Sequence, residues 1–177
     1  MNNVQEYGRA LFELAAESGT TKKIYGDVMA LREIILKNPE YAKLLDTPAI
    51  TREERTALID EAFCGVDEYL CNLIKIMADG HVAYLFPKAA DAFSALYDEA
   101  EGIERVEAIS AVALTEAQRA ALTARLAEIT GKKIVLTTVV DRSILGGMKL
   151  RFASKQLDGS VKTRLDTLAK SLSGTVV

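Results

Sequence analysis

The chain has one histidine, no tryptophan, three prolines and two cysteines in 177 residues. His81 is the only histidine available to a histidine-based zinc site or to a Ser-His or Cys-His relay, so such sites have almost nothing to work with. His81 directly follows Gly80, so we interpret it as a surface or helix-capping residue. The sequence also has no G-x-x-x-x-G-K-[ST] loop. We therefore predict no catalytic, cofactor or metal site, and a chain that is not an enzyme.

Long apolar runs are missing too. No stretch approaches the roughly 20 residues that a membrane helix requires. The first six residues lack the basic and apolar blocks of a signal peptide. We therefore expect no membrane insertion, and a chain that remains in the compartment where it is made.

The two cysteines, Cys64 and Cys71, are seven residues apart. On one continuous helix they would be about 10 Å apart, which is too far for a disulfide. A helix break at Gly65 would change that distance, so the spacing alone leaves the question open. We favour the interpretation that both are buried, reduced thiols.

Composition and charge describe a globular chain with two different halves. Hydrophobic residues make up 49% of the sequence and charged residues 27%. Residues 1–104 contain 10 Lys and Arg against 19 Asp and Glu, whereas residues 105–177 contain 12 against 6. This asymmetry predicts a domain boundary near Gly102–Arg105 and different partners for the two halves. The alternative is that the charges of two solvated surfaces merely diverged, one becoming acidic and the other basic.

Residues 1–104 contain apolar stripes at helical spacing, separated by short breaks. Gly19 is positioned to end the first helix, and Asn38-Pro39 stops the second. Thr51 and Glu54 have the spacing of a capping box. We predict a bundle of six helices: residue 4 to Gly19, Thr21 to Asn38, Glu40–Leu45, Thr51 to Phe63, Asp67–Asp79 and Val82–Glu101.

The sixth predicted helix contains a proline, Pro87, which a helix tolerates only in its first turn. The start of this helix is therefore expected nearer Phe86. Gly102 ends it. Its core-facing stripe is predicted to be Leu85, Ala89, Phe93, Leu96 and Ala100.

The pattern changes after residue 105. Val106–Leu114 is a short, bounded apolar run that suits a buried strand. Thr115 and Gln118 have the spacing of a second capping box, which opens a helix that ends at Gly131.

Two further strands and a last helix are predicted beyond Gly131. Ile134–Val140 is rich in β-branched residues and Met148–Phe152 alternates apolar with basic residues, which together predict a β-hairpin. The last helix carries an apolar stripe of Val161, Leu165, Leu168 and Leu172. The predicted class is α+β: a six-helix bundle over residues 1–104 followed by a β-α-β-β-α module over residues 105–177.

Turn-forming residues separate the elements of this module. Gly146-Gly147 lies within the predicted hairpin, so it cannot cradle a phosphate at a helix N-terminus. Asp141 and Asp158 adjoin turns, where aspartate commonly bonds the local backbone, so we do not interpret them as a catalytic pair. The predicted structural turn residues are Asp141, Gly146, Gly147, Asp158, Gly159 and Ser160.

The basic second half raises an alternative function, a nucleic-acid or nucleotide-binding adaptor. The side chains available for phosphate contacts are Lys132, Lys133, Arg142, Lys149, Arg151, Lys155 and Arg164. The single aromatic residue of this half, Phe152, lies on the apolar stripe of its strand, which leaves no stacking platform for single strands. An acidic protein partner is the better explanation.

Five short motifs occur along the chain in a specific order. They are Y-G-R-A-L-F-E-L-A at 7–15, L-L-D-T-P-A-I at 44–50, I-S-A-V-A-L-T at 109–115, V-D-R-S-I-L-G-G-M-K-L-R at 140–151 and L-D-G-S-V-K-T-R-L-D-T-L at 157–168. Together they resemble the delta subunit of bacterial F-type ATP synthases, which is related to the mitochondrial oligomycin-sensitivity-conferring protein. Gly8 departs from the alanine usual in that family, which should weaken the first helix by roughly 0.5–1 kcal/mol.

The resemblance implies a non-catalytic stator subunit, without cofactors, that couples rotation to ATP synthesis and proton transport. The helical domain would bind the alpha-subunit N-terminal helices, and the C-terminal module would bind the b-subunit stalk. The subunit would lie peripherally at the cytoplasmic face of the bacterial inner membrane. The alpha-subunit segment would occupy a groove between the first and fifth helices, lined by Tyr7, Ala10, Leu11, Leu14, Asn72, Leu73, Ile76 and Asp79.

Overall fold

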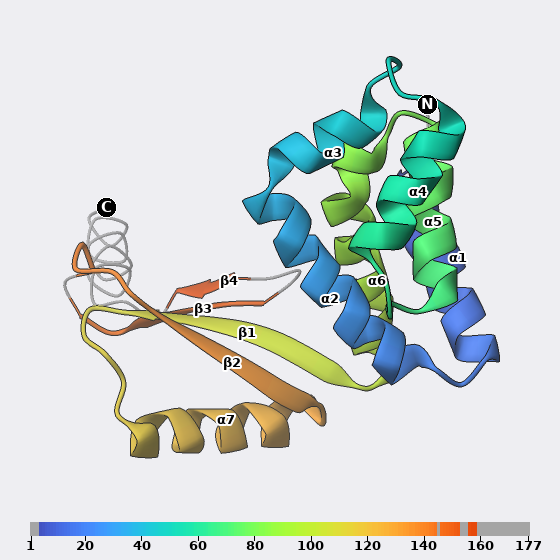
Figure 1. Ribbon diagram of the computed structural model, residues 1–177. Helices are drawn as coiled ribbons and strands as arrows, with labels where there is room; N and C mark the ends of the chain where they lie inside the picture. The colour runs from blue at the N-terminus through green and yellow to red at the C-terminus, as the bar shows by residue number, and fades with distance from the viewer. Residues whose placement is uncertain (1–3, 145, 153–155, 159–177) are drawn as a thin grey trace, which may run out of the picture. The chain divides into compact units, whose positions relative to one another are not determined.

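The computed structural model describes residues 4–144, 146–152 and 156–158 (Figure 1). The chain divides into two compact units, residues 1–100 and 101–177, which we call the helical unit and the sheet unit. Helices in the first unit, and a sheet with a helix in the second, confirm the α+β class. The division falls slightly before the predicted boundary, because the first strand already begins at Ile103.

The helical unit contains six α-helices and one turn of 3-10 helix over residues 4–100. They are α1 (Val4–Glu17), α2 (Thr21–Lys37), α3 (Pro39–Asp46), α4 (Arg52–Ala62), α5 (Glu68–Asp79), the 3-10 turn η1 (Ala83–Leu85) and α6 (Phe86–Ala100). Apolar residues at helical spacing are buried in most of these helices, as in α2 and α5. The largest fully buried side chains of this core include Phe86, Phe93, Ile24, Leu31, Ile59, Ile74 and Met77.

Local capping explains where several helices begin. The Thr51 hydroxyl accepts from the Glu54 backbone N–H, and the Glu54 carboxylate accepts from the Thr51 backbone N–H at 2.9 Å, which confirms the predicted capping box. Asp67 lies just outside α5 as its cap, because its carboxylate accepts from the Tyr69 N–H at 3.2 Å. The predicted fifth helix therefore starts one residue later than expected.

The buried face of α6 differs from the predicted stripe. Tyr97 is buried, whereas Leu96 is half-buried and Ala100 is exposed. The Tyr97 ring stacks on Tyr25 of α2, with ring centroids 4.2 Å apart. This aromatic contact turns the last part of α6 toward α2, and helical spacing alone could not identify that partner.

Gly8 of α1 lies where α1 packs against α6. It is fully enclosed, and a Cβ at this position would lie 2.9 Å from the Ala92 Cβ and 2.9 Å from the Phe93 nitrogen. It would also overlap the Ala89 carbonyl oxygen. The expectation that glycine weakens α1 is therefore incomplete, because the missing side chain is what allows the two helices to approach this closely.

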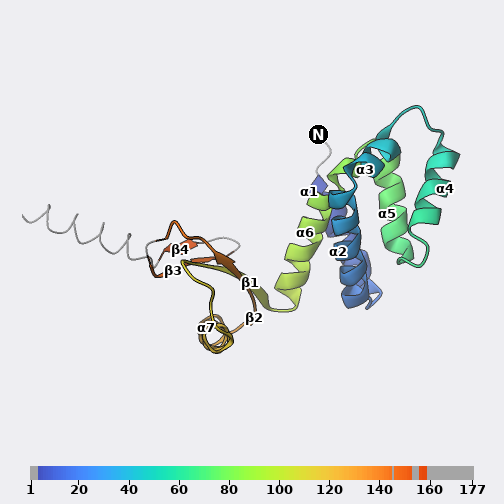
Figure 2. The same cartoon turned by 60° about the vertical axis from the view of Figure 1, so that its left-hand side comes forward.

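The sheet unit has four strands and one α-helix among its described residues. They are β1 (Ile103–Ser110), α7 (Glu116–Thr130), β2 (Lys133–Val140), β3 (Met148–Arg151) and β4 (Gln156–Asp158). The strand order is β2-β1-β3-β4; β1 and β2 are parallel, and the other two pairs are antiparallel. Helix α7 lies along one face of this sheet (Figures 1 and 2). The last predicted helix falls outside the described residues.

The predicted hairpin between Ile134–Val140 and Met148–Phe152 is wrong. The two strands are not neighbours, because each pairs with a different side of β1. The α7 crossover returns β2 beside β1 in the parallel direction, and β3 then pairs with the opposite side of β1. Within the described chain β3 pairs antiparallel with β1 on one side and with β4 on the other, where Leu150 lies opposite Leu157.

Strand β1 begins earlier and ends earlier than the predicted run Val106–Leu114. After its last residue, the Ser110 hydroxyl donates to the Val112 carbonyl oxygen at 2.7 Å, which turns the chain away from the sheet. The capping box of α7 forms as predicted, and Gly131 ends that helix in the left-handed conformation at φ +68°.

Candidate functional site

Helices α1 and α5 contact each other and carry the eight residues that the family resemblance indicated for partner binding. Four come from each helix, at the spacing of neighbouring helical turns. We call this set the α1/α5 face: Tyr7, Ala10, Leu11, Leu14, Asn72, Leu73, Ile76 and Asp79. The tertiary structure thus places both groups on adjacent helices of one unit.

The α1/α5 face has an exposed apolar edge above a buried floor. Leu14 is 44% exposed and Ile76 is 58% exposed, although both are large apolar residues. Leu11 and Leu73 are only 2% and 8% exposed, so they belong to the core that supports this edge. Apolar anchors at helical spacing suit the docking of an amphipathic helix. The face is completed by the exposed Ala10 and Asn72 and the half-buried Tyr7.

Asp79, the last member of the face, is tied to α4. Its carboxylate pairs with the Arg52 Nε at 2.9 Å and with the Arg55 Nη1 at 3.5 Å. These ion pairs join the C-terminal end of α5 to the N-terminal end of α4. Asp79 therefore has a role within the unit, in addition to any contact with a partner.

Arg55 is a buried residue that the sequence analysis did not single out. It is 6% exposed, and its Nη2 donates to the carbonyl oxygens of Thr47, at 3.2 Å, and Ile50, at 3.5 Å. It thereby fastens the segment before α4 to α5 through Asp79. Helical spacing could not have identified it, because arginine at such a position is ordinarily solvated.

Asp46 fastens the end of α3 to the segment after α5. Its carboxylate oxygens accept from the Ala83 N–H at 2.8 Å and the Tyr84 N–H at 2.9 Å. The Asp46 carbonyl oxygen lies 2.8 Å from the Nδ1 of His81. His81 is exposed and has φ +54°, so its place is in a turn at the surface of this unit.

Within the sheet unit, helix α7 covers one face of the sheet, and no other described helix of that unit covers the opposite face. The half-buried Ile134, Leu136 and Thr138 of β2 point toward α7, and the alternate residues point away. On that other side Val135 is 40% exposed and Val139 is 39% exposed. We call this surface the open sheet face: Arg105, Glu107, Ile109, Val135, Thr137, Val139, Lys149 and Arg151.

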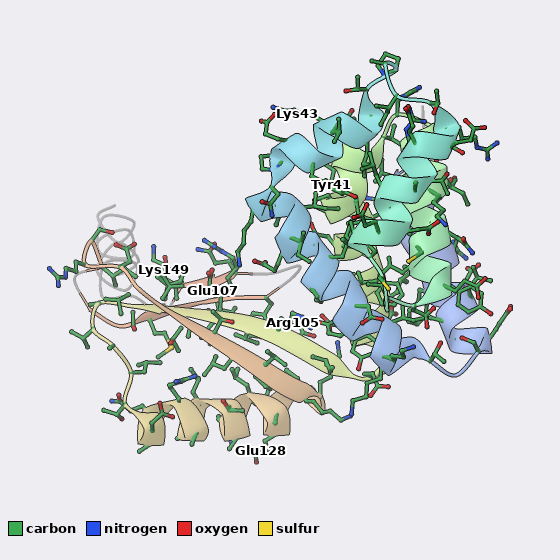
Figure 3. The ribbon with its side chains drawn as sticks, viewed as in Figure 1. Tyr41, Lys43, Arg105, Glu107, Glu128 and Lys149 are labelled. Atoms are coloured by element: carbon green, nitrogen blue, oxygen red, sulfur yellow. The ribbon has the colours of Figure 1, made fainter. Side chains whose placement is uncertain are left out.

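Charged pairs border the apolar residues of the open sheet face. Glu107 pairs with Arg151 at 2.7 Å, and Lys149 pairs with Asp158 at 3.2 Å. Figure 3 shows Glu107 and Lys149 on the side of the sheet away from α7. Elsewhere in the unit, Lys132 contacts Glu104 at 2.8 Å. These pairs neutralise much of the local basic charge, so they give the nucleic-acid alternative no support.

The predicted turn residues lie in two parts of the chain, one from Asp141 to Gly147 and the other from Asp158 to Ser160. The Asp141 carboxylate accepts from the Ser143 N–H at 2.8 Å, and hydrogen bonds from Ser143 hold the pKa of Asp141 below its usual value. Gly146 and Gly147 precede β3, and Gly147 has φ +84°. Asp158 is the last residue of β4 rather than part of a turn, and Gly159 and Ser160 lie outside the described residues.

The prediction that both cysteines are buried thiols is wrong for Cys64 and only partly right for Cys71. Cys64 is exposed and Cys71 is partly buried. Helix α4 ends at Ala62, so Cys64 lies in the turn before α5 instead of on a helix face. The break near Gly65 is therefore real, and the distance expected for one continuous helix does not apply.

Metal sites and membrane-spanning helices are both missing from the part of the chain that the structure describes. There, no cluster of His, Cys, Asp and Glu side chains is arranged to hold a metal ion. The described helices also include none with the length and apolar character needed to cross a membrane.

The sequence profile of one protein family matches nearly the whole chain. That family is described as the ATP synthase delta (OSCP) subunit, and the match covers residues 4–172.

Individual relatives carry the same description over similar lengths. The ATP synthase subunit delta of Azorhizobium caulinodans is 33% identical over 168 residues, which are 94% of this chain and 90% of the relative. That of a Geobacillus species is 31% identical and covers 96% of both chains. That of Leuconostoc citreum is 34% identical over 96% of this chain and 94% of its own.

A solved structure shares the fold. A chain in the cryo-EM structure of the Toxoplasma gondii mitochondrial ATP synthase hexamer superposes with a TM-score of 0.77. The superposition covers 97% of this chain and 98% of that chain, at 23% sequence identity. At this identity the likeness shows a common fold.

Proposed function

The chain belongs to the ATP synthase delta (OSCP) family and is a non-catalytic stator subunit of the F-type ATP synthase, and we propose how its two units divide that role. The helical unit binds the N-terminal helices of the alpha subunits on the catalytic head. The sheet unit binds the end of the b-subunit peripheral stalk. One chain thus holds head and stalk together against the torque of rotation, at the cytoplasmic face of the bacterial plasma membrane.

The α1/α5 face supports the proposed head contact. The observation that carries it is the exposed pair Leu14 and Ile76, on adjacent helices above the buried Leu11 and Leu73. An amphipathic helix laid along this edge would remove both side chains from water without opening the core. The supporting floor is already packed, so little ordering is needed when the partner binds.

The packing of the helical unit suits a subunit that transmits force. Gly8 lets α1 and α6 pack in close contact, and Arg55 ties α4, α5 and the segment before α4 together. Asp46 fastens the end of α3 to the η1 turn. A joint of this kind needs affinity and stiffness, which such contacts provide without a reactive group.

The open sheet face supports the proposed stalk contact. Val135 and Val139 offer an exposed apolar strip, and the ion pairs Glu107–Arg151 and Lys149–Asp158 lie beside it. A stalk helix with apolar residues along one side and charges on its flanks would match this arrangement. The apolar strip would supply affinity, and the charged border would select the partner's orientation.

The head contact is tested by titrating the full-length chain with a peptide of the cognate alpha-subunit N-terminus. Ile76→Asp places a charge on the exposed edge, and we expect affinity to fall at least about tenfold. The matched control is Ile34→Asp, because Ile34 is 47% exposed on α2 and lies outside the α1/α5 face. If the two folded variants bound the peptide equally well, the α1/α5 face would not be part of the interface.

The stalk contact is tested with a soluble C-terminal fragment of the cognate b subunit. Val139→Asp charges the open sheet face, so we expect weaker binding by about tenfold or more. Ile129→Asp is the control, because Ile129 is 67% exposed on α7, the helix that covers the opposite face. Loss of binding only in the Ile129 variant would show that the stalk fragment binds on the α7 side of the sheet.

A further inference from the structure

The turn between α4 and α5 brings the two cysteines of the chain together. The Val66 N–H donates to the Phe63 carbonyl oxygen at 3.1 Å, which closes a tight turn that contains Cys64. The Cys71 thiol, from the second turn of α5, donates to the same Phe63 oxygen at 3.8 Å. The Cys71 sulfur therefore lies against the turn that carries Cys64.

Covalent geometry limits how far apart the two residues are. A carbonyl oxygen lies within about 3 Å of the next Cα, so the Cys71 sulfur is within about 7 Å of the Cys64 Cα. In a disulfide the two sulfurs are about 2.05 Å apart and the Cα atoms about 4.4–6.8 Å apart, so the Cys64 side chain must turn toward the Cys71 sulfur for the bond to form. The exposed Cys64 side chain is free to rotate, and Gly65 has φ +94° with no atom within 4 Å of an added Cβ. The turn thus has space to close the remaining distance.

We propose that Cys64 and Cys71 form a reversible disulfide across this turn when the chain meets a low-molecular-weight disulfide such as oxidised glutathione. The Cys64 thiolate attacks one glutathione sulfur, the S–S bond of the reagent breaks, and one glutathione leaves. The Cys71 thiol then loses its proton to water and attacks the Cys64 sulfur, which releases the second glutathione. Two protein thiols are oxidised, and one small disulfide is reduced to two thiols.

The surroundings assign the two thiols different steps. Cys64 is exposed, so an external disulfide reaches it first. Burial raises the pKa of the Cys71 thiol, Lys75 acts in the opposite direction, and the carboxylates of Asp60, Asp67 and Asp27 raise it further. Cys71 is therefore the resolving thiol. Its step should accelerate about tenfold per pH unit while the pH stays below that raised pKa.

The disulfide would complete the fastening of the α4–α5 pair. The Arg52–Asp79 ion pair joins the start of α4 to the end of α5. The Cys64–Cys71 bond would join the opposite ends of the same two helices. Since α5 carries Ile76, oxidation would hold this part of the α1/α5 face more rigidly. The disulfide itself does not depend on which partner that face binds.

The experiment treats the full-length chain with excess oxidised glutathione at mildly alkaline pH, blocks free thiols by alkylation, and measures intact mass. We expect the unaltered chain to lose two hydrogens and to carry neither glutathione nor the alkylating group. Cys71→Ser should keep one glutathione on Cys64, because nothing resolves the mixed disulfide. Cys64→Ser should remain unmodified. The oxidised chain should melt several degrees higher than the reduced one.

Two results would overturn the proposal. One is an unaltered chain that keeps glutathione on Cys64 while Cys71 is alkylated after unfolding. The other is a covalent dimer through Cys64 in place of the intramolecular bond. Circular dichroism of both serine variants before oxidation would show that each is folded, so neither result could be attributed to a damaged chain.

Discussion

The helical unit closes around its own core, whereas few apolar side chains are buried among the described residues of the sheet unit. Every α-helix of the first unit supplies a side chain that is at most 2% exposed: Leu11, Ile24, Leu45, Ile59, Leu70 and Phe93. Among the described residues of the second unit, the buried apolar side chains are Val106, Ala108, Leu126 and Ile144. Six other large apolar residues there are exposed by 39% or more: Val112, Ile129, Val135, Val139, Val140 and Leu157.

This difference shows two ways of making a binding surface. The α1/α5 face is one edge of a finished core, so a partner adds to a unit that is already stable. The open sheet face is half of a two-sided sheet, so a partner that covers it also completes its burial. We therefore expect binding to stabilise the sheet unit more than the helical unit.

The largest change in stability is expected from a pair of substitutions that replaces one apolar residue in each unit. Phe93→Ala should destabilise the helical unit by about 3–5 kcal/mol, because it leaves a cavity between α1 and α6 where Phe12 packs edge-on against the ring. Val139→Ala should change the stability of the free chain by no more than about 0.5 kcal/mol. Urea denaturation with peptide-resolved hydrogen exchange assigns each loss to its unit. A loss of similar size at Val139 would show that the open sheet face is covered.

A smaller effect is expected where α1 and α6 meet. Gly8→Ala should cost about 1–3 kcal/mol, because the added methyl group overlaps α6. Gly26→Ala is the matched control: it lies within α2 with nothing inside 4 Å of its Cβ position, and should stabilise by about 0.5–1 kcal/mol. Both are measured by the same denaturation. If Gly8→Ala stabilised the chain as Gly26→Ala does, α1 and α6 would be less closely packed than described.

The smallest effect concerns the cap of α4 and its dependence on pH. Backbone and side-chain hydrogen bonds from Thr51 lower the pKa of Glu54. A depressed carboxylate pKa adds stability above the unfolded value of about 4.3, and this is lost as the pH falls through the lower folded value. Glu54→Gln keeps a capping side chain but cannot titrate, so its stability should fall less over that acidic range. Parallel acid titrations that superimpose would mean that the cap is not formed.

Much of the helical structure in both units is encoded in short sequence intervals. The two capping boxes, Thr51 with Glu54 and Thr115 with Gln118, join residues three positions apart, so neither depends on the rest of the fold. Helical stripes such as Ile24, Val28, Leu31 and Ile35 also match the observed core of α2. Family motifs spread along the whole chain identified the function without a catalytic motif to recognise.

The features missed by sequence reasoning join residues that are distant along the chain. β-branched and alternating patterns located β2 and β3, but each strand's partner depended on the α7 crossover. Helical periodicity could not show that Gly8 is needed against α6, that Arg55 is buried beside Asp79, or that Cys64 is exposed. Hydrogen bonds within one or two turns are specified locally, whereas close packing, buried charge and strand order require the whole chain to be in place.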